Sequence, residues 1–423
     1  GRFLPGDSSP ILRKSESAAS TAKRQGPNVK ILVANLGSTS FKYKVFDMPG
    51  GDVLAHGGLD RIGDAQEGSR HKYRLGDAEE VEQPCRLPDH AAAIDEALAR
   101  LTGSGGPLTS VEDLDAVGFK TVHARAITGV VELDDDVIGR MEDFFRLAPA
   151  HNPAYVAAIR QFARVAPGAT RVGCFEPAFH ASAPLRRQLY AIPRHWYEDY
   201  GIRRYGFHGA SHRYAAEKVI ELEGTSRLRH INCHLGGSSS LCAVKDGLSQ
   251  GASHGLSPQG GVPQNNRIGD LDPYALQVVC DQEGISLDRA LEICATEGGM
   301  LGLSGVSNDM RDIEEAAAAG DERCALAIEV FTSAIRDYLG AFVVELGGLD
   351  VISFTGGIGE HSSIVRGQVL AGLEFLGVEL DPEHNESVHG EGTLHAEGSG
   401  VRLRVLRTDE ELIVARQTYE HII

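Results

Sequence analysis

Two distant stretches of the chain share one pattern of apolar and polar positions. Residues 230–247 alternate apolar and polar side chains, pass through Leu-Gly-Gly and three serines, and then alternate again. This pattern predicts two antiparallel strands joined by a tight turn. Residues 31–47 repeat it, with a Leu-Gly turn that is also rich in serine. A repeat at this distance predicts two similar half-domains.

The two turns are candidates for binding phosphate. Glycine leaves backbone N–H groups uncovered, and serine adds hydroxyl groups at the rim of the resulting concavity. One Gly/Ser turn alone is more often an ordinary turn. Two matching turns that face each other across a cleft favour a polyphosphate ligand held between the half-domains.

The periodicity of the remaining chain predicts alternating strands and helices. A long polar loop at residues 255–273 is too rich in glycine and proline for a core, and a loop of this length is usually functional. The other expected elements are strands within 57–86, 114–122, 350–354 and 401–406, helices at 90–101, 134–145, from 154, 273–295, 313–346 (one short, one long) and 410–421, and turns at 302–309 and 355–360, the second opening a helix at Ser362.

Composition narrows the range of functions. At 423 residues the chain is long enough for two domains. It holds 41 basic and 59 acidic residues, and the net charge of −18 excludes nucleic acid and anionic membranes as partners. No uncharged apolar run reaches the length that spans a bilayer. The seven cysteines show no Cys-x-x-Cys spacing, which predicts buried thiols in a reducing, cytoplasmic compartment.

The first 28 residues differ from the rest. They hold five Lys or Arg and many Ser and Gly, without an apolar period, so residues 1–28 are expected to be disordered. An organellar transit peptide, an arbitrary fragment start and an expression tag all fit such a segment.

Polar residues follow two of the predicted buried strands, at the strand end where ligands bind in α/β sheets. Lys120 and His123 follow one strand, and Glu176 follows a strand that ends near Cys174. Each of these side chains alone is more often a solvated lysine, a satisfied histidine or a surface acid. Together they are candidates for a cleft.

The segment 203–212 packs two arginines, two aromatic residues and two histidines around two glycines. Its His208 to His212 spacing fits zinc poorly, because no acidic residue follows the first histidine and Gly209 weakens the helix that such a site needs. Anion binding suits it better. The turn at 355–360 would add a third phosphate or nucleotide contact, and no Walker-type lysine loop occurs in the chain.

These motifs align, in order and over residues 29–423, with those of the acetate kinase family. Residues 31–42 resemble its opening Asn-x-Gly-Ser-Ser-Ser-x-Lys motif, and residues 203–212 match its RRYGFHGxSH signature. His234-Leu235-Gly236 matches its HLG loop, and similarity continues at 149–153, 304–312, 354–360 and 408–411. The resemblance implies an α/β fold of two duplicated domains, like those of sugar kinases, actin and Hsp70, with the active site in the interdomain cleft. Domain I would comprise residues 29–175 with the C-terminal helix 405–423, and domain II residues 176–404 with the nucleotide site.

The resemblance also implies a function. It predicts reversible phosphoryl transfer between ATP and acetate or a slightly larger short carboxylate, with Mg²⁺ as cofactor, in a homodimer. Asn35 and Glu410 would help to hold Mg²⁺, and Lys120, Glu176, His208 and Arg267 would be catalytic, supported by Lys42, His212 and His234. The nucleotide would contact His234, Leu235, Gly236, Gly237, Ser238, Asp309, Met310, Arg311, Gly356, Gly357, Ile358, Gly359 and Glu360. The acyl pocket would be lined by Val122, Ala150, Phe207 and Pro258.

Several residues depart from the family pattern. Lys120 stands where the family has an arginine, which replaces a planar two-pronged donor by a point charge. Glu176 stands in place of an aspartate and Ala150 in place of a leucine. Further departures lie at Gly237, Gly260, Asn265 and Asn266. They leave two alternatives open: a nucleotide-binding homologue that has lost catalysis, and a phosphotransferase with another donor such as pyrophosphate. Acids are also favoured at any helix N-terminus, which would explain Glu410 and Glu411 without a metal.

Overall fold

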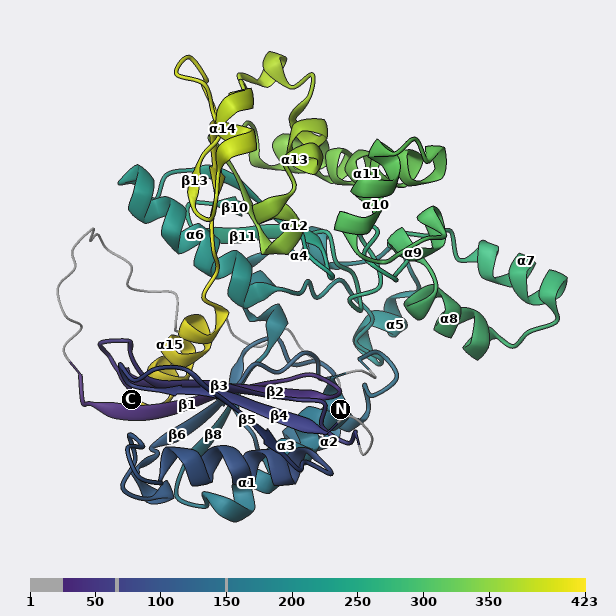
Figure 1. Ribbon diagram of the computed structural model, residues 1–423. Coiled ribbons are helices and arrows are strands. Elements are labelled where there is room, and N and C mark those ends of the chain that lie inside the picture. Colours follow the sequence, from purple (N-terminus) through teal and green to yellow (C-terminus); the bar gives the residue numbers. More distant parts are fainter. Residues whose placement is uncertain (1–25, 65–67, 149–150) are drawn as a thin grey trace.

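The computed structural model describes residues 26–64, 68–148 and 151–423, and it places two β-sheets in separate halves of the molecule (Figure 1). The first sheet has the order β5-β4-β3-β2-β1-β6-β8-β7 and the second the order β11-β10-β9-β12-β14-β13. Strands of the first sheet are β1 (Val29–Leu36), β2 (Ser40–Met48), β3 (Asp52–Asp60), β4 (Ser69–Leu75), β5 (Val81–Cys85), β6 (Ala116–Phe119), β7 (Val130–Glu132) and β8 (Thr170–Cys174). Strands of the second are β9 (Arg229–His234), β10 (Ser240–Lys245), β11 (Leu248–Ala252), β12 (Val351–Thr355), β13 (Gly392–Thr393) and β14 (Arg402–Val405).

The two sheets repeat one topology. In each, an antiparallel meander of three strands (β1-β2-β3 and β9-β10-β11) is extended by two parallel strands beside its first strand (β6 and β8, β12 and β14). A short antiparallel strand, β7 or β13, ends each sheet on that side. The two Gly/Ser hairpins are thus the corresponding first strands of each half, as the repeat in the sequence predicts.

Helices cover both faces of the first sheet because successive side chains of a strand point to opposite faces. Leu32 of β1 joins the core formed with α1 (His90–Leu101), α2 (Asp135–Glu142) and α3 (Asn152–Val165). Its neighbours Ile31 and Val33 face the other way and pack against Val414 of α15 (Glu410–Ile422). The last helix of the chain therefore packs on the first sheet.

The second sheet lies between two long helices. Ile231 and Phe354 pack against Phe331 of α11 (Glu322–Leu346), and Val351 packs on the opposite face against Val219 of α6 (Gly209–Glu223). The other helices are α4 (Leu185–Gln188), α5 (Arg194–Glu198), α7 (Tyr274–Glu283), α8 (Leu287–Thr296), α9 (Gly299–Ser304), α10 (Met310–Ala318), α12 (Gly356–His361), α13 (Ser363–Leu370) and α14 (Pro382–Ser387). None of the helices within the described ranges is long and apolar enough to cross a membrane.

Three local expectations from the sequence are wrong. The turn expected at 355–360 is the helix α12, even though three glycines disfavour a helix. Tertiary contacts stabilise it, because Leu235 O accepts the N–H groups of Ile358 and Gly359 at 2.9 and 3.0 Å. The turn expected at 302–309 begins inside α9, and the single helix at 273–295 is divided at Gly284 into α7 and α8. The segment expected to be disordered lies outside the described residues except for its last three positions.

Gly209 does not prevent a helix either. It is the first residue of α6, where the conformational freedom of glycine costs little, and a side chain there would not fit. A Cβ atom on Gly209 would lie 2.0 Å from the carbonyl oxygen of Glu176. The glycine permits the close approach of these two backbone segments.

Candidate active site

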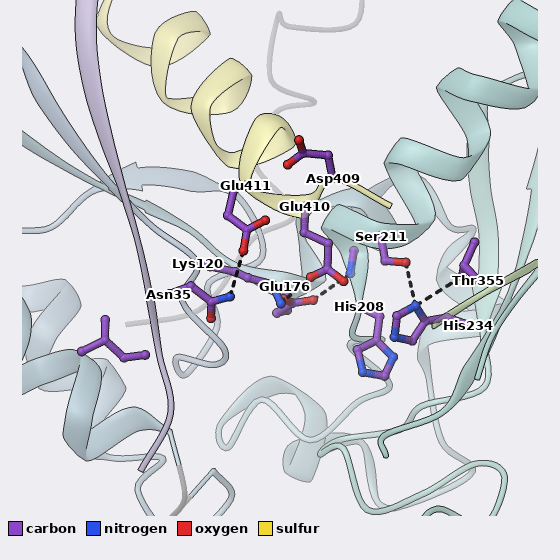
Figure 2. A network of polar contacts seen from close by, with 12 residues as sticks. Asn35, Lys120, Glu176, His208, Ser211, His234, Thr355, Asp409, Glu410 and Glu411 are labelled. Atoms are coloured by element: carbon purple, nitrogen blue, oxygen red, sulfur yellow. Dashed lines mark hydrogen bonds and ion pairs between the residues drawn. The ribbon is translucent and has the colours of Figure 1, made fainter. Parts of the chain in front are cut away.

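Polar side chains from both halves meet near the N-terminus of α15 (Figure 2). Lys120 directly follows β6, and Glu176 follows β8 after one residue, so the parallel strands of the first sheet deliver them to the same edge. Glu410 is the first residue of α15. Nζ of Lys120 lies 3.2 Å from Oε1 of Glu176 and forms a closer ion pair with Oε2 of Glu410. One cation therefore joins two carboxylates that are far apart in the sequence.

This trio carries two negative charges and one positive charge in a site largely closed to water, where the exposed fractions of the Lys120, Glu176 and Glu410 side chains are 18%, 6% and 18%. Burial alone would lower the pKa of Lys120, but the two carboxylates outweigh it and hold that pKa well above 10.5. Burial raises the pKa of Glu176. Burial also opposes ionisation of Glu410, but Lys120 outweighs it and lowers the pKa of this carboxyl.

Asn35, near the end of β1, lies beside this trio. Its amide donates to Oε1 of Glu411 at 3.3 Å, and its Oδ1 accepts the hydroxyl of Tyr155 at 3.4 Å. Glu411 also lies 3.5 Å from Nζ of Lys44, which pairs with Asp409 at 3.0 Å. The partner of Asn35 is thus Glu411, whereas Glu410 pairs with Lys120.

His208 lies just before α6 in a left-handed conformation, with φ 56° and ψ 31°. Such a backbone costs a non-glycine residue about 1–3 kcal/mol and persists only where the surrounding structure enforces it. The Nδ1 atom of His208 lies 2.8 Å from the Ser240 hydroxyl, which also contacts Nε2 of His212 at 2.9 Å. These contacts fix the ring against β10.

His234, at the end of β9, lies next to His208. The centroids of the two rings are 4.3 Å apart, and Nδ1 of His234 contacts the hydroxyls of Ser211 and Thr355 at 2.7 and 3.3 Å (Figure 2). Burial, and then the neighbouring histidines, hold the pKa of His208 well below 6.5. Burial lowers the pKa of His234 as well, so both rings are neutral hydrogen-bonding groups at pH 7.

Arg267, in the long 255–273 loop, reaches toward the second Gly/Ser turn. Its Nη1 donates to Gln264 Oε1 at 3.0 Å, to the Ser238 hydroxyl at 3.2 Å and to the Pro258 carbonyl at 3.5 Å. Burial lowers the pKa of Arg267 from its ordinary value, but a guanidinium remains charged at any ordinary pH. Burial lowers the pKa of His151 to about 4, and the positive charges of Arg267 and Lys120 contribute to this shift. The loop thus brings a cation to the histidine side of the site.

The residues expected to bind a nucleotide fall into two groups. The turn after β9 and the helix α12 are in direct contact, since Leu235 O accepts two N–H groups of α12 and Leu235 N donates to Thr355 O at 2.8 Å. Gly237 and Gly357 are exposed there. Glu360, at the end of α12, lies 3.6 Å from Arg407.

The second group is the start of α10. Asp309 caps this helix and pairs with Arg311, whose side chain is exposed. Met310 is buried in the core of the second half, so its side chain contacts core residues there. A hydrogen bond between Glu314 and Ser362 connects α10 to the start of α13.

Two of the residues expected to line an acyl pocket, Val122 and Phe207, lie next to His123. Its ring packs 5.2 Å from that of Phe207, centroid to centroid, and its Nε2 lies 2.9 Å from the Leu256 carbonyl, two residues before Pro258. Val122 precedes this histidine and is partly buried. The expected pocket residue Ala150 lies outside the described residues.

Other residues at the site were not predicted. The Ser240 hydroxyl forms hydrogen bonds with the rings of His208 and His212. The Tyr155 hydroxyl donates to Asn35, and Glu411 contacts both Asn35 and Lys44. Glu411 fits the pattern of an ordinary acid at a helix N-terminus, and Ser240 is the last of the three serines in the turn, where a hydroxyl at the rim carries no signal of a contact with histidines. Among the described ranges, no three His, Cys, Asp or Glu residues form a group that could hold a metal by themselves.

Comparison with known proteins gives the family. The model of the Acetokinase family matches residues 30–416. The acetate kinase of Carboxydothermus hydrogenoformans is 40% identical over 399 residues, which are 93% of this chain and 100% of that one. The acetate kinase of Thermotoga maritima is 42% identical over 399 residues, 93% of this chain and 98% of that one.

Solved structures give the same result. The crystal structure of Porphyromonas gingivalis acetate kinase superposes with a TM-score of 0.83 at 37% identity, over 93% of this chain and 100% of that one. A propionate kinase from Francisella tularensis gives a TM-score of 0.83 at 29% identity, over 92% and 98% of the two chains. The fold class expected from the sequence is confirmed. The chain belongs to the acetokinase family, a family of carboxylate kinases.

Proposed function

We propose that this protein transfers the terminal phosphoryl group of ATP to acetate or a slightly larger short-chain carboxylate, giving ADP and an acyl phosphate. The observation that carries the proposal is the meeting of Lys120 and His208 beside the N-terminus of α15, between the two halves, with Arg267 bonded to Ser238 in the Gly/Ser turn that follows β9. Phosphoryl transfer needs positioning and neutralisation of charge more than covalent chemistry, and these groups supply both.

In the forward direction, a carboxylate oxygen of the substrate attacks the γ-phosphorus, and the bond from that phosphorus to the β,γ-bridging oxygen breaks. The bridging oxygen leaves on ADP with the bonding electron pair, so no proton is transferred. Short carboxylic acids are ionised at pH 7, and the site therefore needs no general base. Arg267 and the neutral ring of His208 would donate hydrogen bonds to the equatorial oxygens of the moving group, while Lys120 would attract the substrate carboxylate.

The residues present suit Mg²⁺. This ion prefers oxygen ligands, and protein sites for it use one or two carboxylates together with substrate phosphates and water. Glu410 offers a carboxylate and Asn35 an amide oxygen, whereas the structure provides no complete cage of its own among the described residues. Glu410 and Asn35 would hold the ion, which would neutralise charge on the phosphates. Glu411 would orient Asn35 through the amide hydrogen bond.

The nucleotide would lie on the second half. The His234–Ser238 turn and Gly356–Glu360 would contact its phosphates through exposed backbone, and Asp309 to Arg311 would border the adenosine. The carboxylate would lie on the other side of the transferred group, near Val122, Phe207 and Pro258. This arrangement assigns residues 29–175 with 405–423 to domain I and residues 176–404 to domain II.

A homodimer and a cytoplasmic location belong to the same proposal. Helices α7 and α8 project from the second half (Figure 1), and α7 has no buried residue. Tyr274, Val278 and Leu287 expose 81%, 60% and 55% of their surface on this arm. Exposed apolar groups of this kind mark contact surfaces, and a second copy of the chain would cover them. All seven cysteines are free, which suits a reducing compartment.

One assay tests the proposed reaction. Purified protein is incubated with Mg²⁺, either ATP or pyrophosphate, and acetate, propionate or butyrate, and acyl phosphate is trapped with hydroxylamine. We expect product with ATP for at least one acid. Product with pyrophosphate but not with ATP would mean that pyrophosphate is the phosphoryl donor. Binding of nucleotide without formation of any product would indicate a homologue that has lost catalysis.

A further inference from the structure

Glu176 is fully engaged by the protein itself. Its Oε1 lies 3.2 Å from Nζ of Lys120, and its Oε2 accepts the backbone N–H of Gly209 at 2.9 Å. The side chain is 6% exposed. Each oxygen of this buried carboxylate therefore already has a partner within the protein.

The second of these bonds acts on His208. Gly209 follows His208 directly and begins α6, and its Cα is pressed so closely to the Glu176 backbone that a Cβ would lie 2.0 Å from the Glu176 carbonyl oxygen. His208 keeps a left-handed backbone that a non-glycine residue adopts at a cost. The hydrogen bond from Gly209 N–H to the Glu176 carboxylate is a contact that holds this backbone in place.

The first bond sets where the carboxylate lies. Lys120 is held from the other side by Glu410, and its main-chain N–H donates to Ala34 O at 3.1 Å, so the ammonium group has little freedom. The Glu176 side chain must span the distance from its own backbone to both Lys120 and Gly209. An aspartate is one methylene shorter and cannot meet both partners from the same backbone position.

The charge of Glu176 is less critical than its length. Lys120 faces two carboxylates, so the trio keeps one cation and one anion if Glu176 is made neutral. Removing one partner of a buried pair is costly when it leaves a charge unbalanced, which is not the case here. A glutamine at this position keeps an oxygen that can accept the Gly209 N–H.

We infer that Glu176 is a positioning residue, matched in length to Lys120, which orients His208 through Gly209. Its side-chain length is then the property on which turnover depends, and its charge is secondary. The inference rests on the proposed function for its effect on turnover, and on the geometry alone for its effect on folding. It also explains why two departures from the family pattern occur together, because a shorter cation and a longer carboxylate at contacting positions preserve their combined reach.

The test compares Glu176→Gln with Glu176→Asp. We expect Glu176→Asp to lower kcat about a hundredfold, with the KM for ATP unchanged, since a displacement near 1 Å can have an effect of this size. The kcat of Glu176→Gln should stay within about tenfold of that of the parent. The opposite order, with the charge-preserving aspartate more active than the glutamine, would overturn the inference and assign Glu176 an electrostatic or basic role at the reacting atoms.

The double variant Lys120→Arg/Glu176→Asp gives a second test. A longer cation meets the shortened carboxylate, so the double variant should recover at least about tenfold over Glu176→Asp. A double variant no better than the product of its two single variants would contradict the length match. Glu142→Asp is the control, since it shortens a carboxylate in an exposed ion pair with Arg160 at 2.8 Å and should leave turnover unchanged.

Unfolding by urea separates this inference from the proposed function. Glu176→Asp should lower the midpoint, and the added Lys120→Arg should restore part of the loss, whether or not the parent phosphorylates any carboxylate. A parent protein without kinase activity would refute the proposed function, whereas additive effects of the two substitutions on the midpoint would refute the pairing itself.

Discussion

The side-chain amide of Asn35 donates a hydrogen bond to Oε1 of Glu411 at 3.3 Å, across 376 positions of the chain. The bond joins the end of β1 in the first hairpin to the first turn of the last helix. Since the amide nitrogen faces Glu411, the oxygen of Asn35 is directed away from it, toward the Tyr155 hydroxyl at 3.4 Å. The two neighbouring acids of α15 therefore have different tasks, because Glu411 orients Asn35 while Glu410 pairs with Lys120.

This division of tasks predicts different effects of Glu410→Gln and Glu411→Gln. Loss of the Glu410 carboxylate should abolish most of the Mg²⁺-dependent turnover with little change in nucleotide affinity, because a candidate metal ligand is removed. Glu411→Gln should mainly raise the Mg²⁺ concentration needed for half-maximal rate. Titration of the rate with Mg²⁺, together with calorimetric binding of ATP, measures both.

If Glu410→Gln and the parent were equally active at limiting Mg²⁺, Glu410 would be only an acid that stabilises the N-terminus of α15. Asp409→Ala is a suitable comparison, since Asp409 accepts the Leu412 N–H as the cap of α15 and alanine removes this acceptor. We expect this variant to be less stable, by about 1 kcal/mol, while its Mg²⁺ requirement stays that of the parent.

Arg267 should act on the transition state. Its guanidinium lies over the second Gly/Ser turn through Ser238, where charge would develop on the moving phosphoryl group. Removing one such donor costs about a hundredfold or more in kcat, so Arg267→Ala should show this loss at saturating ATP. An unchanged kcat with weakened nucleotide binding would make Arg267 a binding anchor, and Arg267→Lys should recover only part of the rate.

Much of the fold could be predicted from the sequence because its signals are local. The hairpins follow from alternation and a Gly/Ser turn, and α1 has the predicted bounds His90–Leu101 because Asp89 caps it and its apolar residues recur at helical spacing. The helix α12 has no such local signal, because its stability comes from contacts with other segments. Leu235 O binds its N–H groups, and Arg366 donates to the Gly359 and Glu360 carbonyls at 3.0 and 2.9 Å.

The site was predictable as a set of residues but not as a set of partners. Motifs named Lys120, Glu176 and Glu410 separately, yet only the sheet topology and the position of α15 show that they form one ion-paired group. No local signal marks Glu411, because an acid at a helix N-terminus needs no further explanation. Its contact with Asn35 depends on the packing of the last helix on the first sheet, which no local pattern encodes.

Buried histidines should make the protein acid-sensitive. Burial lowers the pKa of His123 and that of His180 from 6.5 to about 4. Between these values the unfolded chain binds protons that the folded chain does not, so the free energy of unfolding falls as pH falls from about 6.5 to about 4, by up to about 3 kcal/mol for each histidine. Above pH 6.5 both contributions are fully present.

Urea unfolding at pH 7.5 and pH 5 measures this effect. His123 packs against the rings of Phe144, Tyr205 and Phe207, so His123→Phe should fit and should show a smaller loss of stability at pH 5 than the parent. Replacing the exposed His195 by glutamine is the control and should leave the difference between the two pH values as in the parent. An undiminished difference in His123→Phe would contradict the role of this histidine.

The last prediction concerns the size of the carboxylate substrate. The resemblance puts Ala150 in the wall of the acyl pocket, where the family has a leucine, and a smaller wall leaves room for a longer acyl chain. Each additional buried methylene contributes about 0.8 kcal/mol, or about fourfold in kcat/KM. Lys120 presents a single charge and is already shared between Glu176 and Glu410, so it would orient a substrate as small as acetate less firmly than a two-pronged donor.

We therefore expect propionate or butyrate to have a kcat/KM at least equal to that of acetate, and Ala150→Leu to shift the preference back toward acetate. Phe207 offers a control on the same pocket, because its buried ring packs against His123 and its replacement by leucine should affect the longer acids more than acetate. A strong preference for acetate in the parent, unchanged in Ala150→Leu, would mean that other groups fill the space, such as the 255–273 loop. Measuring kcat/KM for the three acids in the parent and both variants decides between an enlarged and a refilled pocket.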